Sequence, residues 1–406
     1  MSAEASVLII GAGIVGSALA HFLSSSSKKR SITVVDRSID TLVGSTGHAP
    51  GFIGQYIDSE VLTHLARDSV AEYLKVPGCF STVGGLEVAF GSEGIRRLEP
   101  RCELARKRGL SAEIITVNDA AELAPQLVKP SDSDAALHFP ADGTADAPAI
   151  TNYYRDEARK AGVRFLQAEA KRLCIDEGKV TGVEVEVGDD SRLQHLVADR
   201  VSLATGIWAQ ELGAALGFPL PVVPVGHPYM YGRVRGPLLR RLPFVRWPEH
   251  HAYVRDHGTF YGIGTYDHRP LHYKPIDGSA IGNWVGDFQP ALDAATTLFP
   301  DPTREEFPGA VRADKINGIF SMTPDNVPLA GEVSSVKGLY VAVAVWVTHA
   351  SGTAKFISKL IEGEEIDTRL REALDPERFK GNSLPDLERQ SLRGYNDIYK
   401  TEENGP

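Results

Sequence analysis

The stretch that decides the fold reads VLIIGAGIVG and runs from Val7 to Gly16. A short apolar run leads into three glycines in G-x-G-x-x-G spacing, a pattern typical of dinucleotide-binding folds. Gly11 makes the tight turn, Gly13 lets the backbone approach a pyrophosphate, and Gly16 lets the following helix pack on the strand. The anion then lies at the helix N-terminus, where unpaired amides favour it. The stretch predicts an α/β fold with a Rossmann-like nucleotide-binding domain.

Two later segments decide which nucleotide is expected. A second apolar run ends at Asp36, twenty residues after Gly16, where a carboxylate can accept hydrogen bonds from a ribose. The segment GSTGHAPG at 44–51 then combines glycines, small hydroxyls and one imidazole, His48. A nicotinamide-dependent dehydrogenase needs only the first unit. Segment 44–51, together with an A-T-G turn at 204–206, therefore favours a flavin.

Segment 44–51 resembles the G-S-T-x-H-A-x-G motif of the dimethylglycine oxidase, dimethylglycine dehydrogenase and sarcosine dehydrogenase family. These proteins are FAD-dependent oxidoreductases similar to D-amino-acid oxidase. The resemblance covers nearly the whole chain and implies that FAD is bonded covalently to His48 through the flavin's 8α-methyl carbon. The alternative for His48 is a loop histidine that caps backbone groups. The larger family members also carry a folate-binding half, which is missing here, so no built-in tetrahydrofolate acceptor is expected.

The cofactor-binding residues follow from these motifs and from segment 346–349, which precedes an apolar helix. In the resembled family this segment brings backbone amides to the flavin's pyrimidine end, where a helix N-terminus would stabilise negative charge on the reduced ring. His349 is equally consistent with a structural histidine that holds the turn. The expected cofactor-binding residues are Gly11, Gly13, Gly16, Asp36, Arg37, Ser45, Thr46, His48, Ala204, Thr205, Gly206, Trp208, Trp346, Val347, Thr348 and His349.

The resemblance also assigns two catalytic residues. His227, in PVGHPY at 224–229, matches the family's active-site histidine, and Tyr261, in FYGIGTY at 260–266, matches its tyrosine. Oxidation of a C–N bond requires an unprotonated amine, and a histidine with a near-neutral pKa suits that proton management. The alternative for Tyr261 is packing within a sheet with a satisfied hydroxyl.

Residues that bind the substrate are less strongly specified. Tyr229, Tyr253 and Trp346 are candidate walls of an aromatic pocket around a methylated amine. An amino-acid carboxylate would be expected to meet an arginine, because bidentate arginine pairing is the strongest arrangement. Arg255 and Arg269 lie near the right segments, but no spacing rule selects either of them.

The expected function is FAD-dependent oxidation of the C–N bond of a secondary or tertiary amino acid, such as dimethylglycine or sarcosine. Hydride passes to the flavin, and formaldehyde and the demethylated amine are released, with hydrogen peroxide if oxygen is the acceptor. A quinone or an electron-transfer flavoprotein would suit the same ring. Alternative substrates are glycine betaine and proline-like imino acids. A non-catalytic flavoprotein is a further alternative.

Composition excludes several other classes of function. The 406 residues are 42% hydrophobic and 24% charged, which is typical of a globular chain of two domains. The net charge of −10 argues against nucleic acid and anionic membranes as partners. Cys79, Cys102 and Cys174 have no metal-ligand spacing, so no metal is expected. With Val7 so close to the start, no signal peptide is expected, and the location is expected to be cytoplasmic, with the mitochondrial matrix not excluded.

The pattern predicts two interleaved domains. An FAD-binding domain is expected over 1–83, 140–218 and 316–406, and an α+β substrate domain with an antiparallel sheet over 84–139 and 219–315. Helices are predicted at 59–73, 92–108, 118–123, 147–161 and 353–361. Strands are predicted at 84–90, 163–165, 222–234 and 338–344, with hairpins at 178–196 and 252–264.

Overall fold

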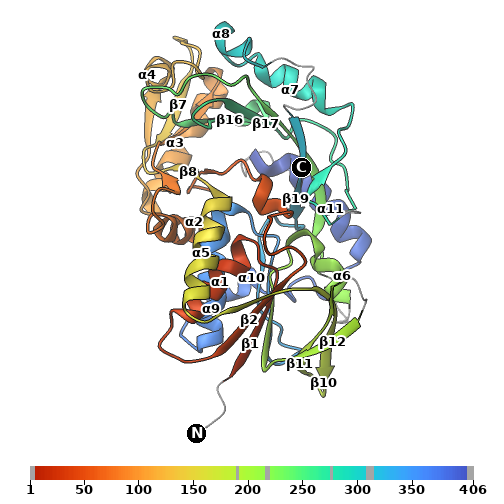
Figure 1. Cartoon of the computed structure of the whole chain (residues 1–406). Coiled ribbons are helices and arrows are strands. Elements are labelled where there is room, and N and C mark those ends of the chain that lie inside the picture. The colour runs from red at the N-terminus through yellow and green to blue at the C-terminus, as the bar shows by residue number, and fades with distance from the viewer. Residues whose placement is uncertain (1–4, 189–191, 215–219, 275–277, 308–314, 400–406) are drawn as a thin grey trace.

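A six-stranded sheet forms the core of the lower domain in Figure 1. The computed structural model describes residues 5–188, 192–214, 220–274, 278–307 and 315–399. The strand order is β20-β21-β13-β1-β2-β9, and every neighbouring pair is parallel except β20 with β21. The strands are β1 (Ser6–Ile10), β2 (Ser31–Asp36), β9 (Arg164–Gln167), β13 (Arg200–Leu203), β20 (Leu329–Glu332) and β21 (Leu339–Val343).

Alternate residues of β1 bury the two faces of this sheet. Val7 and Ile9 pack under the helices, whereas Leu8 and Ile10 pack against a small antiparallel sheet. The helices of this domain are α1 (Ile14–Ser24), α2 (Glu60–Tyr73), α5 (Ala147–Lys160), α9 (Ala350–Glu362) and α10 (Thr368–Leu374). A short helix, α6 (Ala209–Gly213), lies in the sequence just before the chain enters the upper domain for the second time. The small sheet consists of β10 (Glu169–Asp176), β11 (Lys179–Val187) and β12 (Arg192–Val197). Burial on both faces explains why the central strands are almost entirely apolar.

A nine-stranded sheet forms the upper domain, in the order β18-β19-β14-β17-β16-β15-β5-β7-β6. Only the pairing of β15 with β5 is parallel among these described strands. The strands are β5 (Gly85–Ala89), β6 (Glu113–Thr116), β7 (Ala135–Phe139), β14 (Val223–Tyr231), β15 (Phe244–Trp247), β16 (Ala252–Asp256), β17 (Tyr261–Thr265), β18 (Ile281–Gly282) and β19 (Lys315–Met322). Its helices are α3 (Gly91–Lys107), α4 (Val117–Leu123), α7 (Phe288–Thr296) and α8 (Asp301–Arg304).

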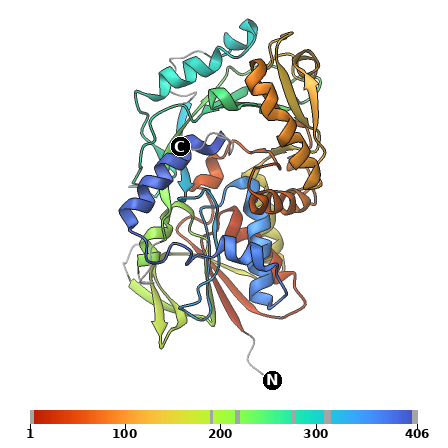
Figure 2. The ribbon, with the colours of Figure 1, turned by 180° about the vertical axis from the view of Figure 1, so that it is seen from behind.

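The junction between the domains contains a third small sheet and the C-terminal helix. Strands β3 (Phe52–Ile53), β8 (Gly143–Ala145) and β4 (Phe80–Ser81) pair where the chain crosses between the domains. Helix α11 (Leu384–Asn396) packs on β14 and β19 and lies at the level of the junction in both views (Figures 1 and 2). The end of the described chain therefore returns to the upper sheet.

The predicted fold class is confirmed, but one domain boundary needs correction. Residues 316–322 were expected in the FAD-binding domain, yet β19 pairs with β14 from Lys315 to Met322 within the nine-stranded sheet. The contact of α11 with that sheet likewise removes part of the C-terminal segment from the lower domain. Both segments were assigned from their position in the sequence. Their actual location follows from the pairing of β19 with β14 and from the packing of α11 on these strands.

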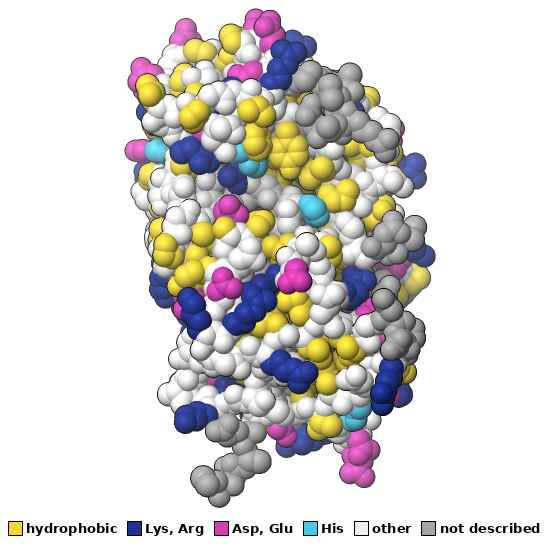
Figure 3. Space-filling view, in the orientation of Figure 1, with side chains coloured by type: hydrophobic (Ala, Val, Ile, Leu, Met, Phe, Trp, Pro, Cys, Tyr) yellow, Lys and Arg dark blue, Asp and Glu magenta, His cyan; other side chains and the backbone are white. Residues whose placement is uncertain are grey.

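On the face shown in Figure 3, acidic and basic side chains are scattered among polar and apolar ones. No helix among the described residues has the length and apolar character needed to cross a bilayer. Nor do the described His, Cys, Asp and Glu side chains gather into a group of three or more suited to a metal ion.

Candidate active site

A cavity of about 480 Å³ extends from the glycine turn of the lower domain to the face of the upper sheet. This volume lies within the range of small-molecule and cofactor sites. All the residues expected to bind the cofactor line it, except Gly16. His227, Tyr229 and Tyr253 line its upper part. The structure therefore brings together motifs that are separated by more than 300 positions, from Gly11 to His349.

The three glycines of the turn have different surroundings. Gly11 has φ +107°, and a Cβ there would lie 2.3 Å from the carbonyl oxygen of Ala204. A Cβ on Gly16 would lie 1.9 Å from the Gly11 carbonyl oxygen, so Gly16 packs helix against turn rather than lining the cavity. Among the described residues beyond its chain neighbours, a Cβ on Gly13 would approach only the Thr46 hydroxyl, at 3.2 Å. Gly13 thus leaves the open cradle that a pyrophosphate needs.

Asp36 and Arg155 fix the shape of this turn. The two carboxylate oxygens of Asp36 accept from the backbone amides of Ala12, at 2.7 Å, and Ser38, at 2.8 Å. Arg155 donates from Nε to the Ala12 carbonyl, at 3.1 Å, and from Nη1 to the Ile39 carbonyl, at 2.6 Å. Sequence reasoning missed Arg155. Its position among the buried residues of α5 is the signal that could have found it.

The segment around His48 is held rigidly while the imidazole itself stays free. The Thr46 hydroxyl accepts from the amide of Ile14, at 3.2 Å, and Ser45 donates to the carbonyl of Ile319, at 2.9 Å. Within the described residues, His48 makes no hydrogen bond or ion pair, and burial lowers its pKa. A neutral ring at the cavity wall is consistent with a bond to a ligand. It is not consistent with a histidine that caps the backbone.

Segment 346–349 meets the cavity at the start of α9. It forms a short 3₁₀ turn, η6 (Val347–His349), and Tyr73 donates to the Val347 carbonyl at 2.6 Å. Burial lowers the pKa of His349 to about 3, and its Nε2 has no partner among the described residues. The buried polar atoms of Thr205 and Trp208 are likewise unpartnered within the described chain. These unpaired groups, together with the Gly13 cradle, fit a polar cofactor such as FAD.

The upper wall of the cavity consists of tyrosines packed over glycines. Tyr229 and Tyr253 lie on the cavity face of β14 and β16. A Cβ on Gly262 would lie 2.1 Å from the Tyr229 hydroxyl, and a Cβ on Gly264 would lie 2.4 Å from the Tyr253 ring. The alternating glycines of β17 therefore make room for both rings, a meaning of the Y-G-I-G pattern that the sequence alone did not reveal.

The structure does not support the predicted position of Tyr261. Strand alternation puts Tyr261 on the opposite face of β17 from the glycines, where it packs in the cluster that includes Met230 and Phe299. The Arg235 guanidinium lies 4.0 Å from the centre of its ring, and Tyr261 does not line the cavity. Alternation predicts which residues share a face, but it cannot tell which face meets the cofactor.

His227 occupies the centre of a buried hydrogen-bond chain. Its Nε2 lies 2.7 Å from the Tyr253 hydroxyl and its Nδ1 lies 2.6 Å from the Tyr395 hydroxyl. His268 Nε2 lies 2.8 Å from the same Tyr395 oxygen. Burial and the nearby His268 lower the pKa of His227 well below its usual value, so this imidazole is neutral near pH 7.

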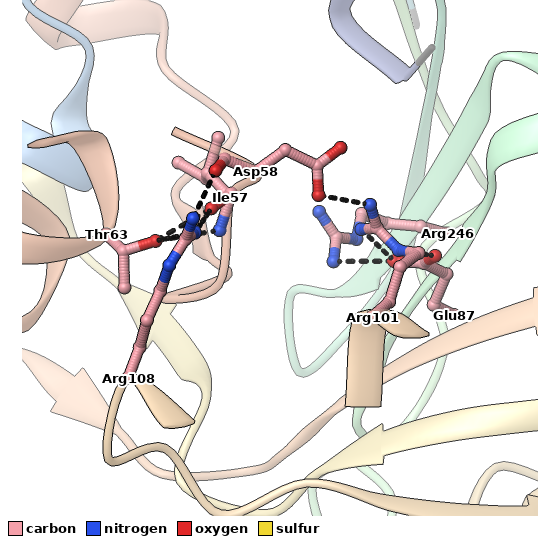
Figure 4. Close-up of polar contacts among 7 residues, drawn as sticks. All are labelled: Ile57, Asp58, Thr63, Glu87, Arg101, Arg108 and Arg246. Atoms are coloured by element: carbon pink, nitrogen blue, oxygen red, sulfur yellow. Dashed lines mark hydrogen bonds and ion pairs between the residues drawn. The ribbon is translucent and has the colours of Figure 1, made fainter. Parts of the chain in front are cut away.

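A second group that sequence reasoning missed is a charged cluster at the cavity wall (Figure 4). Glu87 lies between Arg101 and Arg246, and Arg101 also pairs with Asp58 at 2.6 Å. Although burial opposes it, the charges of Arg101 and Arg246 lower the pKa of Glu87. Arg108 supports the cluster through the backbone of Ile57 and Asp58.

Neither arginine proposed from the sequence reaches the cavity. Arg255 is buried and donates to the carbonyl of Pro50, and Arg269 is exposed. Among the arginines that line the cavity, Arg246 lies opposite Tyr253 on the neighbouring strand, and its position inside the apolar run FVRW at 244–247 is the signal that could have found it.

Comparisons with known proteins agree with this arrangement. The profile described as FAD dependent oxidoreductase matches residues 6–360. The chain is 28% identical over 396 residues to mitochondrial dimethylglycine dehydrogenase of Rattus norvegicus, covering 93% of this chain and 45% of that protein. It is 24% identical over 414 residues to 4-methylaminobutanoate oxidase (formaldehyde-forming) of Paenarthrobacter nicotinovorans, covering 97% and 48%. The chain thus spans less than half the length of these curated relatives.

The fold matches that of solved structures over nearly the whole chain. L-proline dehydrogenase from P. horikoshii superposes with a TM-score of 0.80 at 22% identity, covering 93% of this chain and 98% of that one. Glycine oxidase from Geobacillus kaustophilus superposes with a TM-score of 0.75 at 22% identity, covering 93% and 100%. At these identities the likeness shows the fold alone.

Proposed function

Because this chain belongs to the FAD dependent oxidoreductase family, we propose that it oxidises the C–N bond of an N-methylated amino acid such as dimethylglycine or sarcosine. The observation that carries the proposal is a single cavity. Gly13 and the His48 ring line its lower part, and the neutral His227 and Arg246 line its upper part. The buried Nε of Arg246 has no hydrogen-bond partner among the described residues. The relatives named for dimethylglycine and 4-methylaminobutanoate support an N-methylated substrate.

The lower part of the cavity supplies the groups that would hold FAD. The turn at Gly11–Gly13 and the N-terminus of α1 suit the pyrophosphate, and Asp36 has lone pairs left for a ribose. Backbone amides at the start of α9 suit the pyrimidine end of the ring. When bound, FAD supplies a two-electron acceptor for the hydride on the carbon beside the substrate nitrogen.

We infer that His48 carries the covalent link to the flavin. In such a link a ring nitrogen of His48 would replace one hydrogen of the 8α-methyl group. The two protons and two electrons released would have to be taken up by an external two-electron acceptor. A neutral imidazole is required because a protonated ring has no free lone pair, and burial of His48 keeps it neutral. The absence of any described hydrogen-bond partner leaves its nitrogen available.

The upper wall keeps the substrate amine neutral. A cationic nitrogen cannot give up hydride from its neighbouring carbon, so the ammonium must first lose a proton. Tyr253 and His227 line the cavity and are bonded to each other, and neither is charged near neutral pH. The Tyr253 oxygen can accept a hydrogen bond from the substrate nitrogen. Tyr229, which bonds to His257 at 2.8 Å, packs beside it.

Arg246 is the side chain best placed to bind the substrate carboxylate. Arg101 pairs with the Glu87 carboxylate through Nε, at 2.9 Å, and through Nη2, at 3.1 Å. Arg101 therefore compensates most of the negative charge of Glu87. Arg246 bonds to Glu87 only through Nη2, at 3.1 Å, while its buried Nε has no partner in the described chain. Cross-strand pairing puts Arg246 beside Tyr253. A carboxylate at Arg246 would therefore bring an amine within the same part of the cavity as Tyr253.

The overall reaction consumes one water and one two-electron acceptor. The neutral amine loses hydride, water adds to the resulting iminium carbon, and that carbon leaves as formaldehyde while the nitrogen keeps its remaining substituents. With oxygen as the acceptor, the product is hydrogen peroxide.

The test is turnover of the holoprotein in air with dimethylglycine, sarcosine and 4-methylaminobutanoate, with formaldehyde and peroxide measured separately. Formaldehyde formed in equal amount to the amine consumed supports the proposal. Oxidation of proline without any turnover of N-methylated compounds would contradict it. Formaldehyde without peroxide would contradict only oxygen as the acceptor.

A further inference from the structure

Four buried side chains form a continuous hydrogen-bond chain that starts at the cavity and leaves it. Tyr253 and His227 line the cavity, whereas Tyr395 of α11 and His268 after β17 do not. The links are 2.7, 2.6 and 2.8 Å long in that order, and His268 Nδ1 ends the chain at 2.9 Å from the Arg269 carbonyl. Exposure rises from at most 2% for the first three side chains to 9% for His268.

The direction of every bond in this chain follows from its last member. The Arg269 carbonyl can only accept, so neutral His268 carries its proton on Nδ1 and accepts at Nε2. Tyr395 has one proton, which it donates to His268, so it accepts from His227 Nδ1–H. His227 Nε2 then accepts from the Tyr253 hydroxyl. His227, Tyr395 and His268 are each used once as donor and once as acceptor, whereas the Tyr253 hydroxyl only donates.

This polarity leaves the Tyr253 oxygen as the entry point for a proton from the cavity. The chain can then shift by one proton at every link. Tyr253 gains the incoming proton and passes its own to His227 Nε2, and His227 passes its Nδ1 proton to Tyr395. Tyr395 passes its proton to His268 Nε2, which ends doubly protonated. No bond between heavy atoms changes, and one positive charge moves from the cavity to His268.

His268 is the best member of the chain to hold that charge. Burial lowers the pKa of His268, but Asp267, on its own loop, and Asp287, beside α7, oppose this shift and favour the protonated ring. The other groups that face it are uncharged: the Tyr395 hydroxyl from α11 and the edge of Phe288 from α7, with ring centres 4.7 Å apart. His227 is less exposed than His268. A positive charge on His268 would also oppose protonation of His227.

Hydrogen bonds from Asn396 hold helix α11 against the loop that carries His268. Asn396, next to Tyr395, donates to the carbonyls of Tyr266, at 2.7 Å, and His268, at 2.9 Å. The loop that carries His268 and the helix that carries Tyr395 are therefore fixed relative to each other. This fastening keeps Tyr395 in place even though α11 is distant in sequence from the strands.

We propose that Tyr253, His227, Tyr395 and His268 form a proton relay that takes the proton of the substrate ammonium out of the cavity and holds it on His268. The relay rests on the proposed amine oxidation. When the two-electron acceptor takes up its protons, the reverse shift returns this proton to the cavity and restores the starting polarity. Tyr395 and His268 are positioning residues in this account, since neither touches the substrate.

The decisive variant is Tyr395→Phe, which keeps the buried ring and removes only the hydroxyl that links the two histidines. Anaerobic reduction of the bound flavin by saturating dimethylglycine is followed across pH. At pH values below the pKa of the substrate amine, we expect reduction to be slower by about 10-fold to 100-fold, which reaches the lower end of the range of about 10²–10⁴-fold for proton-transfer groups. Above that pKa the amine is already neutral, and the rate should approach that of the wild type. The matched control is Tyr154→Phe, which loses a buried hydroxyl bonded to Ser351 outside the cavity.

Equal slowing at every pH would assign Tyr395 a structural role and overturn the relay, as would an unchanged rate at low pH. A second measurement does not depend on turnover. Nitrogen NMR of labelled histidines should show His227 and His268 as neutral rings with the proton on Nδ1, and Tyr395→Phe should release the His227 tautomer. A wild-type His227 protonated on Nε2 would refute the relay. A flavin that no amine reduces, with the expected tautomers present, would refute the proposed function instead.

Discussion

Substitution of single glycines in the first turn separates folding from cofactor binding. Gly13→Ala places a methyl group where, apart from its chain neighbours, the Thr46 hydroxyl is the one heavy atom of the described residues within 4 Å, at 3.2 Å. Gly13 is the N-cap of α1 with φ −67° and ψ −175°, which any residue can adopt. Loss of a glycine N-cap costs up to about 1 kcal/mol, and the lower entropy of the unfolded chain offsets about 0.4–1 kcal/mol. The stability of the apoprotein should therefore change by less than about 1 kcal/mol.

Gly11→Ala should behave differently. Its φ of +107° is unfavourable for any residue with a Cβ, and that atom would lie 2.3 Å from the Ala204 carbonyl oxygen. A left-handed conformation costs about 1–2 kcal/mol, and forced overpacking adds about 1–3 kcal/mol. We expect a loss of about 2–5 kcal/mol in the free energy of unfolding. Gly11→Ala should therefore reduce folded protein and flavin content together.

The assay pairs urea unfolding of the apoproteins with flavin content of the purified holoproteins. Gly13→Ala, and more strongly Gly13→Val, should fold but retain little FAD. A loss of about 100-fold in the affinity of such a variant for FAD would correspond to about 2.8 kcal/mol of binding free energy. Full flavin content in Gly13→Val would refute the placement of the pyrophosphate at this turn. A Gly13→Ala apoprotein as unstable as Gly11→Ala would refute the geometric argument.

Four further results are expected. Acid precipitation of the wild type should leave a yellow pellet, and His48→Ala should release the colour to the supernatant; a colourless wild-type pellet would contradict the covalent link. Arg246→Met should raise KM for dimethylglycine at least about 10-fold, since charged hydrogen bonds contribute about 1.5–3 kcal/mol, with a smaller effect on kcat. Tyr253→Phe should slow flavin reduction most strongly at low pH. Because burial lowers the pKa of His257 to about 2 and of His349 to about 3, the unfolded chain binds more protons, and the free energy of unfolding should fall as pH drops below about 6.5.

Two substitutions control for these effects. Arg269→Gln removes a positive charge from an exposed site and should leave KM for dimethylglycine unchanged. Tyr154→Phe removes a buried hydroxyl that does not line the cavity and should leave the pH profile of flavin reduction unchanged. If Arg269→Gln raised KM as much as Arg246→Met, the effect would be one of net charge rather than of a carboxylate site.

The lower domain could be predicted because its determinants are local in sequence. Strand, glycine turn and helix follow one another from Val7 to Ser24, and the motif residues Gly11, Gly13 and Asp36 all line the cavity. Segment 44–51 is also contiguous, so its place at the cavity followed from the resemblance. The fold class and the cofactor family were therefore accessible without coordinates.

The upper wall could not be predicted because tertiary pairing forms it. Tyr261 and Gly262 are adjacent, and only the register of β17 with β14 shows that the glycine, not the tyrosine, faces the cavity. Arg246 reaches the cavity because its strand lies between β16 and β5. Tyr395 meets His227 from 168 positions away. No short-range pattern encodes such a contact.

The measurement that tests the central claim most directly is anaerobic mixing of the purified holoprotein with dimethylglycine. The account predicts that the yellow absorbance of the flavin disappears, that one formaldehyde forms per flavin reduced, and that the colour returns when an acceptor is admitted. Glycine betaine, which has no nitrogen lone pair, should leave the colour unchanged. A flavin that stays oxidised with dimethylglycine, sarcosine and 4-methylaminobutanoate alike would contradict the account.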